Sequence, residues 1–244
     1  MTQLVIGRYR VRTAQSGDDL HAAQALRHLA FFGFEGLDED PFDEICTHIL
    51  IEEVAGGRLV CCFRMLPLTR GTEINRSYSA QFYELSALQR YDGKMVEMGR
   101  FCILPDIKDP DILRLAWGAM TRYVDENDVE MLFGCSSFSG TDADSYLDAF
   151  AMLKERHLAP RRWLPRVKAP SVFRFAQKLR RRKPDARLAM SRMPPLLRTY
   201  LLMGGWVSDH AVVDRQLNTL HVFTGLEIKA IPATRKRLLR AVAL

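Results

Sequence analysis

The chain has 244 residues, of which 48% are hydrophobic and 26% are charged, with five cysteines. This composition excludes a disordered tail, a collagen-like fibre and a small disulfide-stapled protein. The net charge of +6 combines −10 in residues 1–150 with +16 in residues 151–244, so the second part faces nucleic acid, anionic lipid or an acidic protein.

Apolar periodicity over residues 1–156 predicts strands alternating with helices. In chain order these are a strand at 9–13, a helix at 20–32, a β-hairpin of strands 48–54 and 59–66, a strand at 95–104, a helix at 109–126, a strand at 130–136 and a helix at 142–156. This order predicts an α/β (α+β) fold with a mixed central sheet flanked by helices.

The composition changes after residue 157. Residues 158–195 are rich in proline and contain the basic run 178–183, which predicts an extended or flexible excursion rather than a second domain. Order returns with a helix at 195–203 and two β-rich runs, 206–213 and 220–228, before a basic helical tail at 229–244. We therefore expect a single domain over residues 1–244.

The sequence also indicates where in the cell the protein acts. Gly7, Arg8 and Arg10 interrupt the first apolar run, so we expect no secretion signal. No stretch reaches the roughly 18 apolar residues of a spanning helix. Scattered cysteines without CxxC or HxxxH spacings favour reduced thiols and no metal site. We expect a cytoplasmic protein, in solution or peripheral at the inner membrane.

The carboxylate-rich loop at residues 38–44 is the first candidate site. It has the charge to hold a cationic substrate, although runs of like charge more often face water. The spacing of an EF-hand calcium loop is missing.

The second candidate is the strand at 95–104, where Glu97 and Arg100 interrupt an apolar run. Charges in a central strand are expensive unless they are paired or used. Glu97 therefore forms either a structural ion pair, for instance with Arg64, or part of a catalytic pair. Gly99 permits a β-bulge that would redirect these side chains.

The third candidate is the run 134–141, which we expect to form a loop between a strand and a helix. Its hydroxyls, among them Ser136 and Ser137, would meet a ligand there or simply cap the helix. The GxSxG spacing of a nucleophile elbow is absent, and Cys135 fits a small core residue better than a nucleophile.

Three stretches resemble landmarks of the N-acylhomoserine lactone synthases of the GNAT superfamily. They are Asp40–Asp43 for D-x-x-D, Arg64–Pro67 for R-L-L-P, and Glu97–Phe101 for E-x-S-R-F. A closer resemblance is to the L-ornithine Nα-acyltransferases, which make lyso-ornithine lipid from 3-hydroxyacyl acyl carrier protein. The stretches that carry it span roughly residues 8–225 and are Arg100–Pro105, Leu132–Asp142, Pro194–Leu201 and Val213–Thr219.

The resemblance implies transfer of an acyl chain from acyl carrier protein to the α-amine of ornithine. In this interpretation Glu97 is the general base, and Arg64 and Arg100 orient it or bind the substrate carboxylate. Asp40 and Asp43 would then hold the cationic groups of the amino acid.

The remaining site residues follow from the same interpretation. Ser136 and Ser137 assist the oxyanion or pantetheine, beside backbone amides where strands 97–104 and 130–136 splay apart. Phe101 lines the acyl chain, together with Trp117, Phe133 and Phe138, unless these aromatic residues are simply core.

Two departures from the family pattern affect these expectations. Gly99 replaces the serine of E-x-S-R-F, which removes a hydroxyl near the site. Residues 104–113 contain no glycine, so the pyrophosphate loop of coenzyme A-dependent members is missing. A phosphopantetheine thioester on acyl carrier protein is therefore the expected donor, with no tightly bound cofactor. Carrier proteins and the inner membrane are both anionic partners for the basic second part.

Several alternatives remain open at this point. The acceptor is ornithine, glutamine, glycine or another amino acid, or the product is a homoserine lactone. Segment 195–203 with the basic run either lies on the membrane or packs on the sheet. A nucleic-acid-binding module would use Arg180–Lys183, but no aromatic stacking platform or reading helix accompanies this run, so we expect no nucleic-acid partner.

Overall fold

The computed structural model describes residues 4–243, and the chain forms two compact units. Unit 1 contains the residues up to Pro67, Met98–Val129 and the residues from Ala233, and unit 2 contains Leu68–Glu97 and Glu130–Pro232. Residues 1–3 and 244, at the ends of the predicted domain, lie outside the described residues. Each unit combines separate stretches of the chain, so no single cut in the sequence divides the fold.

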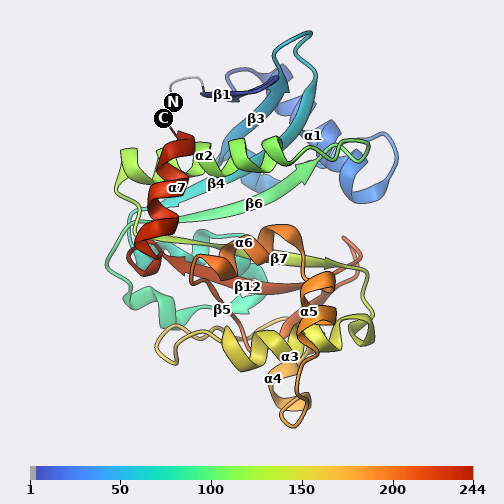
Figure 1. Ribbon diagram of the computed structural model, residues 1–244, viewed down its shortest axis with the longest axis vertical. Helices are drawn as coiled ribbons and strands as arrows, with labels where there is room; N and C mark the ends of the chain where they lie inside the picture. Colours follow the sequence, from blue (N-terminus) through green and yellow to red (C-terminus); the bar gives the residue numbers. More distant parts are fainter. Residues whose placement is uncertain (1–3, 244) are drawn as a thin grey trace. The chain divides into compact units, whose positions relative to one another are not determined.

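The sheet of unit 1 is an antiparallel meander that ends on strand β6 (Figure 1). Its strands are β1 (Leu4–Ile6), β2 (Tyr9–Thr13), β3 (Thr47–Glu53), β4 (Leu59–Leu68) and the second part of β6 (Met95–Ile103). The β3–β4 turn contains Gly56 and Gly57 at φ +82° and +69°, a conformation that glycine adopts without a steric penalty. The predicted hairpin is therefore confirmed.

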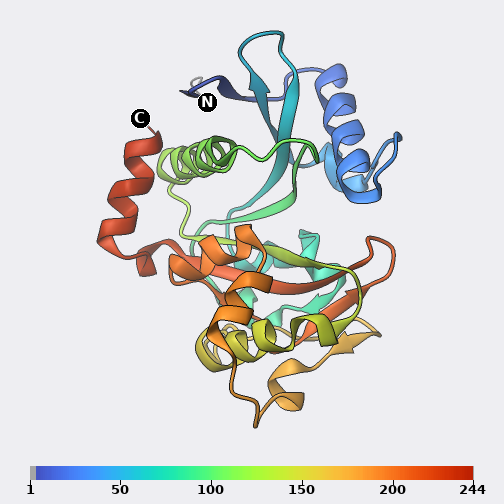
Figure 2. The same ribbon diagram turned by 45° about the vertical axis from the view of Figure 1, so that its right-hand side comes forward.

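Two helices pack on this sheet, α1 (Gly17–Phe32) and α2 (Pro110–Asn127), and a third, α7 (Ala233–Ala243), packs on α2. The Ser16 hydroxyl accepts a hydrogen bond from the amide of Asp19 and so caps α1. Ala23 and Leu26 of α1 pack against apolar side chains of the sheet, namely Leu50, Cys62 and Cys102. Helices α2 and α7 lie side by side (Figures 1 and 2).

The sheet of unit 2 is centred on β7 (Met131–Ser139). The first part of β6 pairs with β7 in parallel, and this pairing runs from Met95–Met131 to Glu97–Phe133. On its other side β7 pairs with β12 over its whole length. The remaining strands are β12 (Thr219–Glu227), β11 (Ala211–Asp214), β9 (Val172–Phe173) and β10 (Trp206–Val207), and a separate pair joins β5 (Tyr83–Glu84) to β8 (Arg166–Val167).

The hydrophobic core of unit 2 lies between this sheet and four helices. Phe138, Leu220 and Val222 of the sheet are fully buried against the helices, which are α3 (Leu147–Arg156), α4 (Phe175–Lys178), α5 (Ala186–Arg192) and α6 (Pro195–Leu202). The ring of Tyr83 packs on Phe223, with 5.7 Å between ring centroids. Short 3-10 turns complete the chain: η1 (Pro41–Glu44), η2 (Gly71–Arg76), η3 (Ser79–Gln81), η4 (Ser86–Arg90), η5 (Ala143–Tyr146) and η6 (Ile228–Ala230).

The structure corrects two expectations. Strand β7 continues to Ser139, so the run expected to be a loop after residue 133 is largely strand, because β12 pairs with all of it. Residues 158–195 are folded rather than extended: they contain β8, β9, α4 and α5. Phe175 and Ala189 give this basic segment buried anchors, with 0% exposure each. Among residues 4–243, no helix has the length and apolar character to cross a membrane.

Gly71 tests the packing of the segment 68–94, for which the sequence predicts no regular element. A Cβ atom there would overlap the carbonyl oxygen of Leu88 and lie 2.8 Å from that of Tyr91. We expect Gly71→Ala to lower the free energy of unfolding by about 1–3 kcal/mol in urea titrations. Gly17→Ala is the control, since a Cβ atom there meets nothing within 4 Å. Equal effects of the two substitutions would contradict this packing.

Candidate functional site

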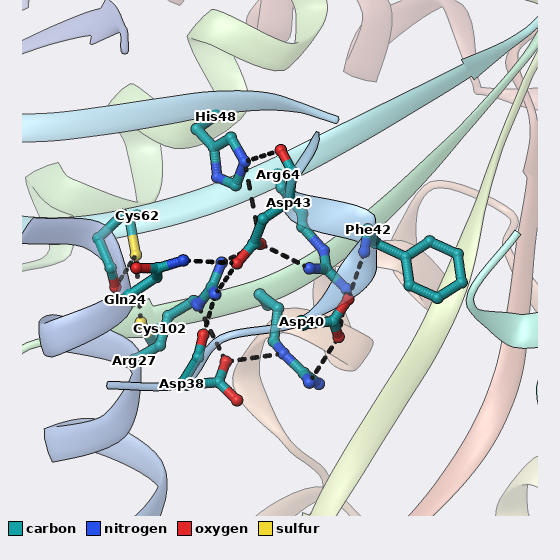
Figure 3. Close-up of polar contacts among 12 residues, drawn as sticks. Gln24, Arg27, Asp38, Asp40, Phe42, Asp43, His48, Cys62, Arg64 and Cys102 are labelled. Atoms are coloured by element: carbon teal, nitrogen blue, oxygen red, sulfur yellow. Dashed lines mark hydrogen bonds and ion pairs between the residues drawn. The ribbon is translucent and has the colours of Figure 1, made fainter. Parts of the chain in front are cut away.

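Six ionised side chains meet in unit 1. They come from α1, from the loop that follows it, and from β4 and β6, and they are Arg27, Asp38, Asp40, Asp43, Arg64 and Arg100 (Figure 3). Three positive charges balance three negative charges, which is the condition under which buried ions are tolerated. We call this group the Arg–Asp cluster.

Asp43 lies at the centre of the cluster, between Arg27 and Arg64 (Figure 3). Its carboxylate accepts hydrogen bonds from both guanidinium groups at 2.7–2.8 Å and from Gln24 Nε2 at 3.0 Å. Burial alone would raise the pKa of Asp43, but the hydrogen bonds from Arg27 and Gln24 and the nearby positive charges lower it well below its usual range. Asp43 is therefore ionised at neutral pH.

Asp38 and Asp40 tie the same loop to the two strands. Asp40 Oδ2 accepts hydrogen bonds from Arg64 at 3.0 Å and Arg100 at 2.9 Å, and its Oδ1 accepts one from the amide of Phe42 at 2.7 Å. Asp38 Oδ2 lies 2.9 Å from Nε of Arg27 and of Arg100. The loop expected to be a solvated carboxylate run is instead held against the sheet by arginines.

Arg100 has a left-handed backbone, with φ +53°. This conformation costs a non-glycine residue about 1–2 kcal/mol, and it breaks the alternation of side chains along β6. The irregularity predicted at Gly99 therefore falls one residue later. The left-handed backbone at Arg100 directs its guanidinium toward Asp38 and Asp40.

Glu97 belongs to unit 2 and is 4% exposed. Within this unit its carboxylate accepts three hydrogen bonds: from the amide of Tyr78 at 2.7 Å, the amide of Ser79 at 2.7 Å and the Ser79 hydroxyl at 2.6 Å. Cys135 Sγ lies 3.5 Å from the same hydroxyl. These three donors hold the carboxylate in a defined position.

The other predicted site residues occupy varied environments. Ser136 is buried and accepts a hydrogen bond from the hydroxyl of Thr224 at 2.9 Å, whereas Ser137 is exposed. Phe101 is half-buried and stacks on Phe63, with 5.7 Å between centroids.

Of the aromatic residues considered for the acyl chain, Phe133 and Phe138 are at most 1% exposed and belong to the packing of unit 2. For these two rings the structure supports a core role rather than an open lining.

The structure thus brings Arg64, Arg100, Asp40 and Asp43 together in one cluster in unit 1, and in unit 2 Glu97 accepts hydrogen bonds from Tyr78 and Ser79. Sequence reasoning missed Arg27 and Ser79. Arg27 carried a signal, since it falls beside Leu26 and four residues after Ala23 on the apolar face of α1. Ser79 carried none, because residues 68–94 lack a helical or strand period.

The chain is similar to known proteins in sequence and in fold. Residues 23–118 match the acetyltransferase (GNAT) domain family. An L-ornithine Nα-acyltransferase from Rhodobacter capsulatus is 31% identical over 239 residues, which cover 91% of each chain. A protein of the same name from Brucella abortus is 28% identical, over 93% of this chain and 86% of that one.

Among solved structures, the N-acyl amino acid synthase FeeM from uncultured soil microbes has a TM-score of 0.51. It is 10% identical in sequence, and the match covers 97% of each chain. This likeness supports the fold and carries no residue-level assignment.

Removing an arginine from the buried Arg–Asp cluster should cost more stability than removing one from an exposed ion pair. Arg27 is 1% exposed, so Arg27→Met leaves Asp38 and Asp43 buried without full compensation. We expect it to lower the free energy of unfolding by about 3–5 kcal/mol in urea titrations. The control is Arg58→Met, which removes an exposed pair with Asp106 and should cost less than about 1 kcal/mol. Similar losses in the two variants would be inconsistent with a buried, charge-balanced cluster.

Proposed function

This chain belongs to the L-ornithine Nα-acyltransferase family, and we propose that it transfers a 3-hydroxyacyl chain from acyl carrier protein to the α-amine of ornithine. The product would be lyso-ornithine lipid. The observation that carries the proposal is the buried Glu97 carboxylate, held by three hydrogen-bond donors in a fold of the GNAT type. A carboxylate held in one position is suited to accept a proton from a bound amine or water.

The reaction joins an amine nitrogen to a thioester carbonyl carbon. Attack forms a tetrahedral intermediate, whose negative oxygen requires hydrogen-bond donors. Glu97 takes the proton that the nitrogen must lose, directly or through a water. The carbon–sulfur bond then breaks, and the departing phosphopantetheine thiolate takes up a proton. An amide and a thiol are the products.

Strand β7 offers donors for the oxyanion and for the pantetheine arm. Within unit 2, β7 pairs with β6 only as far as Phe133, and its six further residues pair with β12 alone. We propose that backbone amides along this edge bind the donor. Ser137 is exposed and is the better placed of the two predicted serines, because Ser136 already bonds to Thr224.

The donor proposal rests on the sequence of the loop before α2. Residues 104–109 contain no glycine with which backbone amides could closely approach a pyrophosphate. Phosphopantetheine on a carrier protein has no such pyrophosphate, so it makes no demand on this loop.

The predicted roles of Asp40 and Asp43 in holding the substrate ammonium remain predictions, and charge balance counts against them. Both carboxylates already face arginines, and the cluster has no net negative charge with which to attract a cation. We propose that these aspartates hold Arg64 and Arg100 in place, and that the arginines supply positive charge for the substrate carboxylate.

The basic segment of unit 2 has the character of a membrane-contact surface. Its exposed cations include Arg180, Arg181, Lys183, Arg187 and Arg192, and Leu188 and Met190 lie among them in the sequence with 45% and 36% exposure. Cations interspersed with apolar side chains suit an anionic lipid interface. We propose that this surface binds the inner membrane peripherally, where the lipid product is released.

Product analysis tests the reaction. Purified protein is incubated with 3-hydroxyacyl carrier protein and an equimolar mixture of ornithine, glutamine, glycine and S-adenosylmethionine. We expect mass spectrometry to find Nα-acylornithine as the main product. Glu97→Gln should reduce kcat about 10²- to 10⁴-fold, the usual contribution of a general base.

Acyl-coenzyme A in place of the carrier-protein thioester is the donor control and should give a much lower rate. Acylglutamine as the main product would contradict the acceptor. Full activity in Glu97→Gln would contradict the assigned base.

Vesicle binding tests the membrane proposal. A variant with Arg180, Arg181 and Lys183 changed to Gln should lose co-sedimentation with anionic vesicles, since each cation near such a surface contributes about 1 kcal/mol. The matched control changes Arg235, Lys236 and Arg237 in α7, which removes the same charge elsewhere. Equal losses in both variants would indicate that only net charge matters.

A further inference from the structure

Ser79 is the residue most closely tied to Glu97 in unit 2. It is 0% exposed, and it supplies two of the three hydrogen bonds to the carboxylate described above, one from its amide and one from its hydroxyl. Both reach Oε1, at 2.7 and 2.6 Å. Two donors from one residue on one oxygen fix the rotation of the carboxylate as well as its position.

The hydroxyl of Ser79 can donate only one hydrogen. The 2.6 Å separation from Oε1 is typical of a hydrogen bond to an ionised oxygen, so that hydrogen points at Glu97. Cys135 Sγ, 3.5 Å away, is then the donor to Ser79 Oγ. In this arrangement the Cys135 thiol donates to the Ser79 hydroxyl, and the Ser79 hydroxyl donates to the Glu97 carboxylate.

We propose that Ser79 is a positioning residue for Glu97, and that its hydroxyl sets the lower pH limit of acyl transfer. This inference rests on the proposed role of Glu97 as general base. Ser79 itself touches neither amine nor thioester. It acts by holding the carboxylate in one orientation and by favouring its ionised form.

The direction of the effect follows from the hydrogen bond. A donor that faces a carboxylate stabilises the charged form and so lowers the pH at which a proton binds. Without the hydroxyl, Glu97 takes up a proton at higher pH and stops acting as a base sooner on acidification. Losing one charge-assisted hydrogen bond is expected to move this limit upward by roughly one pH unit.

The test compares Ser79→Ala with the wild-type enzyme from pH 4.5 to 8, using carrier-protein donor and ornithine. The quantity measured is the ratio of their kcat/KM values for ornithine. The free amine of ornithine titrates identically with both enzymes, so its effect cancels in the ratio. We expect a ratio that is constant near pH 8 and falls as the pH decreases, with the full fall of about tenfold, equivalent to about 1.4 kcal/mol, reached below the lower pH limit of the wild-type enzyme.

Ser77→Ala is the matched control. Ser77 is also buried, in the same turn, but its hydroxyl donates to the carbonyl of Ile74 and accepts from the amide of Ala80. Removing it weakens the turn without touching Glu97, so its ratio should stay flat. Ser79→Cys supplies a second variant, whose weaker thiol donor should give a smaller fall than alanine.

A flat ratio for Ser79→Ala, or an equal fall for Ser77→Ala, would overturn the inference. For each variant, the ratio to the wild-type enzyme is compared across pH. A partly unfolded preparation therefore lowers this ratio by the same factor at every pH, provided that circular dichroism is constant over the range. Full activity in Glu97→Gln would instead refute the proposed function. An inactive Glu97→Gln with a flat Ser79→Ala ratio refutes only the role of Ser79.

Discussion

The balance of charge around Asp43 is the constraint on which unit 1 depends. Asp43 is 7% exposed and its carboxylate accepts hydrogen bonds from Gln24, Arg27 and Arg64, while Arg27 is 1% exposed. Neither charge would be stable in this place alone. Because the partners come from α1, β4 and the loop between α1 and β3, the cluster fixes the course of that loop. The carboxylate-rich loop at residues 38–44, whose composition is typical of a solvated loop, is therefore held in place by buried ion pairs.

Strand β6 contains both Arg100 of the Arg–Asp cluster and Glu97, the proposed general base. Its residues Met95–Glu97 belong to unit 2 and its residues Met98–Ile103 belong to unit 1. Glu97 and Arg100 are three positions apart, and each has contacts within its own unit. The left-handed backbone at Arg100 directs that side chain to the cluster, while Glu97 receives donors from the turn at Tyr78 and Ser79. One short motif thus contains Arg100, which is held by ion pairs of the Arg–Asp cluster, and Glu97, for which we propose the role of general base.

The sequence predicted the fold better than it predicted the contacts. Strands and helices with a clear apolar period, such as β3, β4 and α2, were found close to their true bounds, because period and burial act over few residues. The partners of Glu97 were not, because residues 68–94 form short 3-10 turns that leave no periodic signal. Segment 158–195 looked extended since its prolines and cations conceal isolated anchors such as Phe175. The left-handed conformation of Arg100 depends on ion pairs with Asp38 and Asp40, which lie about 60 residues away.

We infer that the Arg–Asp cluster supports the fold, and we propose that Glu97 accepts the proton in acyl transfer. The most direct measurement determines urea unfolding and single-turnover acyl transfer on the same preparations of Asp43→Asn and Glu97→Gln. We expect Asp43→Asn to lose more stability, because Arg27 and Arg64 lose their shared partner, and Glu97→Gln to lose more of the rate per folded molecule. The opposite pattern, with turnover abolished by Asp43→Asn in a stable protein and retained by Glu97→Gln, would contradict this expectation.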